Sequence, residues 1–315
     1  MKKKIAVAGL DKKKLNNLKK NFNRFKFIDI SDKNFFTKET SNISALIIYA
    51  EWPVKKSLTK YLTYNYNFFK NIEWVHLSRA GIDEFLSNLK KYTFKFTCGK
   101  IIQGPNVSEH CLALLLSLTR GMFEYDKKKF RPTEVFGKKV LIVGLGGIGI
   151  GVAEKISAFG AKVYGADSSL KPYFSFIEKN YQINEINKII GKFDIVINTT
   201  PLTKLTKNLF DKKLFSKMKK GVFFVNVSRG GIVNTFDLKN YLKKNKFSAV
   251  GLDIIGEGEF VKKNPLKNFK NVIFTNHMAG ITTDMNRRLN LIEENIEKYS
   301  KNSHLLNQID PIKQY

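Results

Sequence analysis

A short apolar run that leads directly into closely spaced glycines constrains this chain more than any other feature. Residues 139–149 read KVLIVGLGGIG, in which Gly144, Gly146 and Gly149 have the spacing G-x-G-x-x-G. The run predicts a buried parallel strand, and the residues after it predict a helix over 150–159. In such a unit the first glycine permits a tight turn, and the second lets a pyrophosphate approach the backbone. The third lets the helix pack closely on the sheet, with its N-terminus toward the phosphates.

An acidic residue follows at the distance that a dinucleotide site requires. The next apolar run, KVYGAD, ends at Asp167, 18 residues beyond Gly149. A carboxylate at the end of the second strand is placed to accept hydrogen bonds from an adenosine ribose. Glycine-rich turns are common, so the alternative is a turn with a structural role only. The combination of strand, glycines, helix, second strand and acid favours a dinucleotide site.

Strands and helices alternate along the whole chain, which predicts α/β domains built on parallel sheets. In the first hundred residues we expect strands at 5–8, 45–49, 74–77 and 94–97 and an amphipathic helix at 12–20. Residues 100–107 are interpreted as a linker, with Ser108 as the N-cap of a helix that ends at Arg120. Beyond the glycine-rich unit we expect strands at 162–166, 193–197, 222–227, 248–252 and 272–275, and a terminal helix at 285–301.

The length of 315 residues favours two domains. We expect residues 101–284 to form the dinucleotide-binding domain. Residues 1–100 and 285–315 are expected to form a second, substrate-binding domain, because the terminal helix should pack back on the N-terminal strands.

The charge of the chain is strongly positive, with 55 Lys and Arg against 27 Asp and Glu. The lysines are scattered over the whole length, as a base-composition bias would place them, and they would also attract an anionic cofactor and substrate. A nucleic-acid partner is the remaining alternative. The chain carries no basic motif interleaved with aromatic residues, so we expect no specific nucleic-acid binding.

No apolar stretch approaches the roughly 20 residues that a membrane span needs. The N-terminal segment MKKKIAVAGL has a shorter apolar part than a secretory signal and indicates a first strand instead. We therefore expect a cytoplasmic protein without a membrane partner. Cys98 and Cys111 lie in no CxxC motif or histidine cluster, so we expect no metal site and two buried thiols.

Three polar segments follow predicted strands directly. They are NTTPLTKLT (198–206), NVSRGGIVN (226–234) and TNHMAG (275–280). The carboxyl ends of parallel strands meet at one edge of a sheet, where ligands bind. We therefore expect Thr200, Arg229, Asp253 and His277 to gather at one edge.

Together these segments resemble the D-isomer-specific 2-hydroxyacid dehydrogenases, such as glyoxylate or hydroxypyruvate reductases and phosphoglycerate dehydrogenases. The resemblance also includes WVHLSRAGIDEF, VSEHCLALLLSLTR and AVGLDI, and it covers nearly the whole chain. It implies an NAD-binding Rossmann domain inserted into a flavodoxin-like substrate domain, both doubly wound. It also implies hydride transfer between NAD and a small 2-hydroxy or 2-oxo acid, in a homodimer.

The resemblance assigns roles to particular residues. Gly147 and Ile148 would lie at the pyrophosphate, and Asp167 would favour NAD because a carboxylate repels a 2′-phosphate. The other cofactor contacts would come from Thr200, Pro201, Thr206, Ser228 and Asp253, of which Asp253 holds the nicotinamide carboxamide. Backbone N–H groups of Ala80 and Gly81 would bind the substrate carboxylate. Arg79 beside them would either reach the substrate or point to solvent.

Arg229 and His277 would be catalytic, and their chemistry supports the assignment. The arginine fork matches carboxylate and carbonyl oxygens and is permanently charged. Histidine titrates near neutral pH, so His277 can donate the proton in reduction and accept it in oxidation. Taken alone, an arginine after a strand is more often ion-paired, and an isolated histidine is more often structural.

One position departs from the family pattern. The family has a catalytic Glu five residues after the aspartate that matches Asp253, and this chain has Gly258 there. Glu257 and Glu259 flank the glycine, and either is a candidate replacement. The departure leaves a second function open, a non-catalytic NAD-sensing interaction protein on the same fold.

Overall fold

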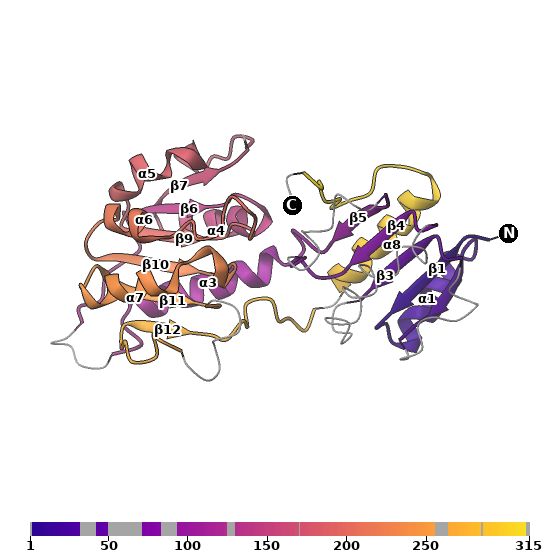
Figure 1. The fold of residues 1–315 in the computed structure, drawn as a ribbon, viewed down its shortest axis with the longest axis horizontal. Coiled ribbons are helices and arrows are strands. Elements are labelled where there is room, and N and C mark those ends of the chain that lie inside the picture. The colour runs from indigo at the N-terminus through magenta and orange to yellow at the C-terminus, as the bar shows by residue number, and fades with distance from the viewer. Residues whose placement is uncertain are drawn as a thin grey trace. The chain divides into compact units, whose positions relative to one another are not determined.

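The computed structural model describes residues 2–31, 42–49, 71–82, 93–124, 130–169, 171–255, 264–284 and 286–312. The chain divides into two compact units (Figure 1). Met1–Ile102 and Thr283–Tyr315 form the first unit, and Gln103–Thr282 forms the second. The chain passes into the second unit after Ile102, two residues later than the expected boundary at 100. It returns to the first unit after Thr282, two residues earlier than the expected boundary at 284.

The second unit is built on a seven-stranded parallel sheet in the order β12-β11-β10-β9-β6-β7-β8. Its strands are β6 (Lys139–Val143), β7 (Lys162–Asp167), β8 (Lys179–Gln182), β9 (Ile195–Asn198), β10 (Val222–Asn226), β11 (Phe247–Leu252) and β12 (Val272–Phe274). The strand order reverses between β6 and β9, which is the place where doubly wound sheets bind ligands. The Rossmann topology expected from the glycine-rich unit is confirmed.

Helices cover both faces of this sheet. They are α3 (Gly104–Thr119), α4 (Gly147–Ser157), α5 (Ile186–Ile189), α6 (Lys212–Lys217) and α7 (Thr235–Lys243), with 3₁₀ turns η3 (Ile183–Glu185), η4 (Ile190–Lys192) and η5 (Gly230–Ile232). Val140 and Ile142 of β6 pack with α3 and α4, whereas Leu141 and Val143 pack with α5 to α7. Strands that are apolar on both faces are typical of sheets with helices on both sides.

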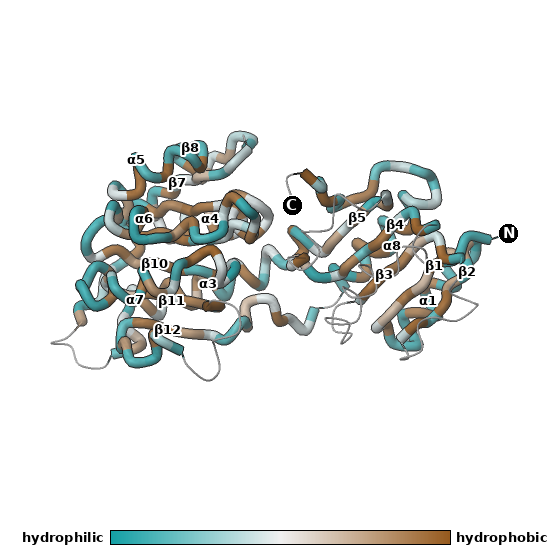
Figure 2. The backbone as a smooth tube through the Cα atoms, in the orientation of Figure 1, coloured by the Kyte–Doolittle hydropathy of each residue, from teal (hydrophilic) through white to brown (hydrophobic). Residues whose placement is uncertain are grey.

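The first unit is a smaller parallel sheet in the order β2-β1-β3-β4-β5. Its strands are β1 (Lys4–Ala8), β2 (Lys26–Asp29), β3 (Ala45–Ile48), β4 (Trp74–Leu77) and β5 (Lys95–Cys98), and its described helices are α1 (Lys12–Asn21) and α8 (Asn286–Ser300). Both helices pack on one face of the sheet, α1 through Leu15 and Leu18 and α8 through Ile292 and Ile296. The order is the flavodoxin-like one, as expected. Figure 2 shows the apolar strands inside each unit.

Two helices begin earlier than the sequence pattern indicated. Helix α3 starts at Gly104, so Ser108 is not its N-cap, and the Ser108 hydroxyl donates to the carbonyl of Pro105 at 2.8 Å. Proline is well suited to a first helical turn because the missing N–H has no helical partner there. Helix α4 starts at Gly147 rather than at residue 150. The short strands β2 and β8 carry exposed polar residues and were not expected.

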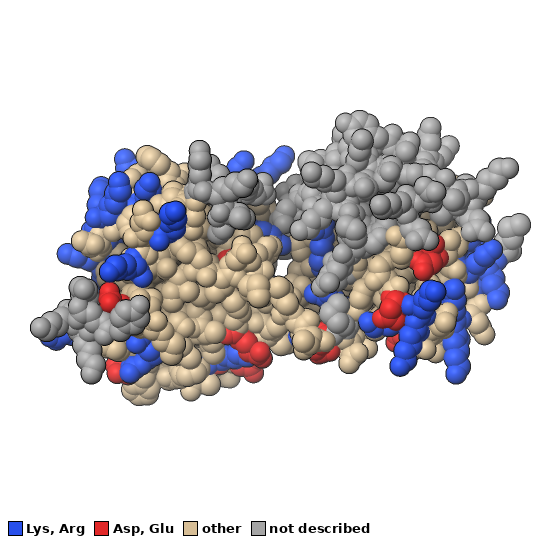
Figure 3. All heavy atoms as spheres, turned by 90° about the horizontal axis from the view of Figure 1, so that it is seen from below, with Lys and Arg blue, Asp and Glu red and all other residues tan. Residues whose placement is uncertain are grey.

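Basic residues occur in several separate places on the face shown in Figure 3, interspersed with acidic ones. In the described ranges no helix is long and apolar enough to span a membrane. Cys98 and Cys111 are both buried free thiols, and burial raises their pKa values to about 11 and about 12. Such thiols stay protonated at neutral pH and are unreactive.

Candidate functional site

The three glycines lie where β6 turns into α4, and each has a different environment. Gly144 has φ +97°, a region that disfavours side chains, and a Cβ there would lie 2.8 Å from the backbone N of Thr200. A Cβ on Gly149 would lie 1.9 Å from the carbonyl oxygen of Gly144. A Cβ on Gly146 would meet no described atom within 4 Å. Gly144 and Gly149 are therefore required by the fold itself, whereas Gly146 faces open space.

The N-terminus of α4 lies beside this open space. Gly146 is the N-cap, the first turn contains no acidic residue, and none of the described side chains caps it. The first N–H groups of a helix lack helical partners and carry partial positive charge, so they bind anions. The glycine turn thus offers a pyrophosphate both space and hydrogen-bond donors.

Asp167 lies at the end of β7, next to the glycine turn. Its carboxylate accepts from the backbone N of Leu145 at 2.6 Å and from the backbone N and hydroxyl of Ser169 at 2.9 and 3.0 Å. The ammonium of Lys171 lies 3.2 Å away. Burial alone would raise the pKa of Asp167, but these hydrogen bonds and Lys171 lower it below its ordinary value. The carboxylate is therefore ionised and held beside the turn.

Two asparagines join the ends of the neighbouring strands β9 and β10. Asn198 Nδ2 donates to Asn226 Oδ1 at 2.9 Å, and both residues are fully buried. Asn198 Oδ1 accepts from the backbone N and the hydroxyl of Thr200 at 3.2 and 2.7 Å. Asn226 Nδ2 donates to the carbonyl of Arg229 at 3.2 Å. This pair fixes the loops that carry Thr200 and Arg229.

The loops after β9 and β10 also contact each other directly. The hydroxyl of Ser228 donates to the carbonyl of Thr200, and Arg229 Nη1 donates to the carbonyl of Ser228 at 2.9 Å. The hydroxyl of Thr206 donates to the carbonyl of Pro201 at 2.6 Å and accepts from the backbone N of Thr203 at 2.8 Å. Thr206 therefore closes its own loop, and its contact with a cofactor stays a prediction.

Asp253 follows β11 and is 1% exposed. Its Oδ1 accepts from the hydroxyl of Thr275 at 2.7 Å and from the backbone N of Met278 at 2.8 Å, and the backbone N of Ala279 lies 3.2 Å from both oxygens. Burial raises the pKa of Asp253, but hydrogen bonds from His110, Thr275 and Ala279 more than offset this and lower it. A buried, ionised carboxylate thus organises the segment after β12.

His277 lies in that segment and is exposed. Its backbone N donates to the carbonyl of Asp253 at 2.5 Å. Asn276 and His277 have φ values of 49° and 60°, in the left-handed region that non-glycine residues seldom adopt. This conformation costs about 1–2 kcal/mol per residue, and asparagine tolerates it better than most. A residue held in a strained conformation by its surroundings is typical of functional positions.

In the first unit, Arg79, Ala80 and Gly81 follow β4. The carbonyl of Arg79 accepts from the backbone N of Gly99 at 2.9 Å. A Cβ on Gly99 would lie 2.5 Å from the carbonyl oxygen of Ser78, so only glycine fits against this loop. The role of the loop toward a substrate stays a prediction. Gly258, Glu257 and Glu259 lie outside the described residues.

The structure adds residues that the sequence interpretation left aside. His110 and Asn106 on α3 contact the segment that carries His277, and Lys171 contacts Asp167. The sequence indicated α3 only as a core helix. The available signal was the spacing of Asn106 and His110, which lie four residues apart and therefore on one face of the helix.

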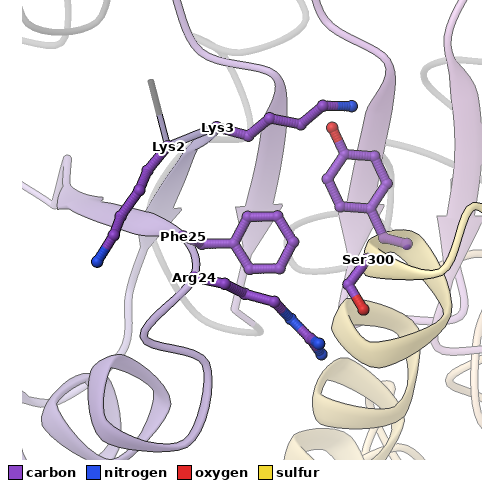
Figure 4. Close-up of a pocket in the computed structure, with 6 residues that line it drawn as sticks. Lys2, Lys3, Arg24, Phe25 and Ser300 are labelled. Carbon is purple, nitrogen blue, oxygen red and sulfur yellow. The ribbon is translucent and has the colours of Figure 1, made fainter.

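A recess of about 580 Å³ lies in the first unit and is lined by Lys2, Lys3, Arg24, Phe25, Tyr299 and Ser300. Its cations have partners nearby: Lys3 pairs with Glu73 at 2.6 Å, and Arg24 pairs with Glu297. Figure 4 shows the side chains of Lys2 and Lys3 pointing in different directions. The Lys2 ammonium donates to the carbonyl of Asn23 at 2.6 Å. Because the cations have these partners and do not converge, we assign no ligand to the recess.

Comparison with known proteins identifies the family. The family model for the NAD binding domain of the D-isomer specific 2-hydroxyacid dehydrogenases matches residues 112–279, more than half of the 315 residues. The chain belongs to this family. The matched residues contain the glycine turn, Asp167, Arg229, Asp253 and His277, and they form an NAD(P)-binding domain.

Named relatives of this dehydrogenase family differ in the acid they act on. The chain is 30% identical over 196 residues to a glyoxylate reductase of Thermofilum pendens, covering 58% of each protein. It is 33% identical over 192 residues to a D-3-phosphoglycerate dehydrogenase of Mycobacterium leprae, covering 58% of this chain and 36% of the relative. The alignments therefore span only part of these relatives.

Solved structures show the same fold over the whole chain. A D-isomer specific 2-hydroxyacid dehydrogenase from Xanthobacter autotrophicus, in complex with NADPH and MES, has a TM-score of 0.84 at 18% identity and full coverage of both chains. A D-lactate dehydrogenase from Aquifex aeolicus, complexed with NAD and lactic acid, has a TM-score of 0.72 at 20% identity, covering 95% of this chain and 96% of that one.

Proposed function

We propose that the protein is an NAD-dependent oxidoreductase that transfers a hydride between nicotinamide and a small D-2-hydroxy or 2-oxo acid. The observation that carries the proposal is the arrangement at one sheet edge. The ends of neighbouring strands bring together an ionised Asp253, the segment with His277 and the loop with Arg229, in the same unit as the open glycine turn. These are the groups that a dinucleotide-dependent reduction requires.

The residues present fit a dinucleotide. The first N–H groups of α4 would hold the pyrophosphate, Asp167 would accept from the adenosine ribose, and Asp253 would accept from the carboxamide. Asp253 Oδ2 has only the N–H of Ala279 at 3.2 Å among the described donors, so it retains acceptor capacity. Thr200, Pro201 and Ser228 would complete the lining. The bound nicotinamide supplies or accepts the hydride.

Arg229 and His277 would act on the acid. The guanidinium of Arg229 binds and orients the 2-oxo acid and polarises its carbonyl. The imidazole of His277 gives a proton to the carbonyl oxygen as the hydride arrives at carbon, and it takes that proton back in the oxidative direction.

We favour NAD over NADP as the cofactor. A 2′-phosphate at the ribose would face the negative charge of Asp167. Lys171, 3.2 Å from that carboxylate, offsets part of this repulsion. Proteins of similar fold are solved in complex with NADP, with NADPH and with NAD, so the fold alone does not decide the preference. We propose that Asp167 and Lys171 decide it in this chain.

The named relatives support a proposal for the chemical class of the substrate. They act on glyoxylate and on 3-phosphoglycerate, both short acids with a carboxylate next to the reacting carbon. We propose a substrate of this class and a homodimer as the working assembly. Gly258 in place of the family's glutamate favours one alternative, a protein that senses NAD without turnover.

The experiment is NADH oxidation with glyoxylate, hydroxypyruvate, pyruvate and 3-phosphohydroxypyruvate, repeated with NADPH. Turnover of one of these acids, faster with NADH, would support the proposal. Tight NADH binding without oxidation by any of them would favour the sensing alternative. A clear preference for NADPH would overturn the argument from Asp167.

A further inference from the structure

Helix α3 holds the segment that carries His277 through two side chains one turn apart. Asn106 Nδ2 donates to the carbonyl of Ala279 at 2.9 Å. His110 Nε2 lies 2.7 Å from the hydroxyl of Thr275 and 3.3 Å from Asp253 Oδ1. Positions four residues apart lie on one face of a helix, so one face of α3 contacts both ends of the 275–279 segment.

The hydrogen bonds fix which nitrogen of His110 carries a proton. The hydroxyl of Thr275 has one hydrogen, and it donates this hydrogen to the carboxylate of Asp253 at 2.7 Å. An ionised carboxylate only accepts, so the Thr275 oxygen must accept from His110. His110 therefore carries a proton on Nε2 and donates it, and a chain of donors runs from His110 through Thr275 to Asp253.

This chain decides the orientation of the Asp253 carboxylate. Thr275, Met278 and Ala279 all direct donors at Oδ1, and His110 Nε2 lies 3.3 Å from the same oxygen. Oδ2 has Ala279 alone among the described residues. The carbonyl of the same aspartate accepts from the backbone N of His277 at 2.5 Å. Loss of the His110 donor would free Thr275 and allow the carboxylate to rotate, and the left-handed backbone at His277 would lose support.

The same helix is packed closely on α4. A Cβ on Gly104 would lie 2.9 Å from the carbonyl oxygen of Gly147, and a Cβ on Gly151 would lie 3.4 Å from the hydroxyl of Ser108. The glycines thus allow α3 to approach the helix whose N-terminus is proposed to hold the pyrophosphate. One rigid helix is therefore in contact with both parts of the cofactor site.

We propose that His110 and Asn106 are positioning residues. They hold the His277 segment and the Asp253 carboxylate in a fixed position relative to α4, the helix that follows the glycine turn. The proposal rests on the proposed function for its effect on catalysis. Its structural part, the anchoring of the segment, holds whether or not the protein turns over substrate.

The test compares His110→Ala, His110→Gln and Thr275→Val with wild type, and Glu109→Ala, an exposed change on the same helix, is the control. With the best 2-oxo acid, His110→Ala is expected to lower kcat about 10- to 100-fold, with a much smaller change in the Kd of NADH. His110→Gln, which keeps an N–H donor, is expected to recover most of the rate. The double variant His110→Ala/Thr275→Val is expected to lose little more than either single variant, because both break one chain.

A second readout does not depend on activity. Amide hydrogen exchange over residues 276–280 is expected to accelerate in His110→Ala and Asn106→Ala and to stay at the wild-type rate in Glu109→Ala. Unchanged exchange would overturn the proposal, and so would equal losses of kcat in His110→Ala and His110→Gln. If wild type shows no turnover but exchange accelerates as expected, the proposed function fails and the anchoring stands.

Discussion

Asn198 and Asn226 form a side-chain hydrogen bond of 2.9 Å between the ends of two adjacent strands, and both are fully buried. Each amide is also bonded to the loop that follows its own strand, Asn198 to Thr200 and Asn226 to Arg229. The pair therefore sets the relative position of a predicted cofactor contact and a predicted catalytic residue. A buried amide is well suited to this because it both donates and accepts.

The Asn198–Asn226 pair is expected to contribute both to the free energy of unfolding and to turnover. Asn226→Ala would leave the Asn198 amide without its acceptor and release the carbonyl of Arg229. We expect the free energy of unfolding to fall by about 1–3 kcal/mol, and turnover to fall further than the stability loss explains. Urea unfolding and NADH oxidation measure these effects. The control is Asn180→Ala, an exposed change on β8, which should alter neither the free energy of unfolding nor the turnover. An equally small effect of Asn226→Ala would contradict the role given to the asparagine pair.

The glycines of the turn should separate folding from cofactor binding. The added Cβ of Gly146→Ala would meet no described atom, so the free energy of unfolding should change by no more than about 1 kcal/mol, while the affinity for NADH falls sharply. Gly149→Ala places a Cβ 1.9 Å from the carbonyl oxygen of Gly144 and should destabilise the second unit by about 1–3 kcal/mol or more. Thermal unfolding and NADH fluorescence titration provide the comparison. If Gly146→Ala binds NADH as wild type does, the pyrophosphate lies elsewhere.

Asp167 and Lys171 should control the choice of cofactor in opposite directions. Asp167→Ser removes the charge that repels a 2′-phosphate, and we expect the preference for NADH over NADPH to fall by at least about tenfold, ~1.4 kcal/mol. Lys171→Met removes the nearby cation and should increase the preference. Ratios of kcat/KM for the two cofactors measure both effects. A wild-type preference for NADPH, or a shift of the same sign in both variants, would disagree with this interpretation.

His76 should make the first unit sensitive to acid. It is fully buried on β4, and burial lowers its pKa from 6.5 to about 3. Between these values the unfolded chain binds the proton and the folded chain does not, so stability falls as the pH falls. From pH 7 to pH 5 this amounts to about 2 kcal/mol.

Unfolding of the first unit can be followed separately because both tryptophans of the chain, Trp52 and Trp74, belong to it. Urea unfolding monitored by tryptophan fluorescence at pH 7 and pH 5 gives the change in the free energy of unfolding with pH. In His76→Gln the free energy of unfolding should depend less steeply on pH over this range, whatever the stability of the variant at pH 7. An identical slope in the variant would show that another group causes the acid sensitivity.

The sequence predicted those parts of the site in which spacing alone determines position. The glycine turn, Asp167 and the polar segments after successive strands follow from local pattern, because parallel strands place their carboxyl ends at one edge. Asp253 was expected at this edge, but the number of donors around it was not. They are a hydroxyl and backbone N–H groups of a segment more than 20 residues away.

Features that depend on packing between distant elements were missed for the same reason. The periodicity of α3 predicts which residues face the core, but it does not predict which loop lies beside His110. The start of α3 at Gly104 was missed because Gly-Pro usually indicates a turn, whereas the structure uses the proline in the first helical turn. Strands β2 and β8 are short and partly exposed, so their apolar signal is weak.

Hydride exchange between nicotinamide and a 2-oxo acid on this chain can be followed with an isotope. The most direct measurement uses NADH carrying deuterium at nicotinamide C4, with mass spectrometry and chiral analysis of the product. We expect a D-2-hydroxy acid with one deuterium at C2 from one face of the cofactor, and a rate about 10²- to 10⁴-fold lower in His277→Asn. Recovery of unreacted NADH and 2-oxo acid, with NADH nevertheless bound, would contradict the proposed hydride transfer.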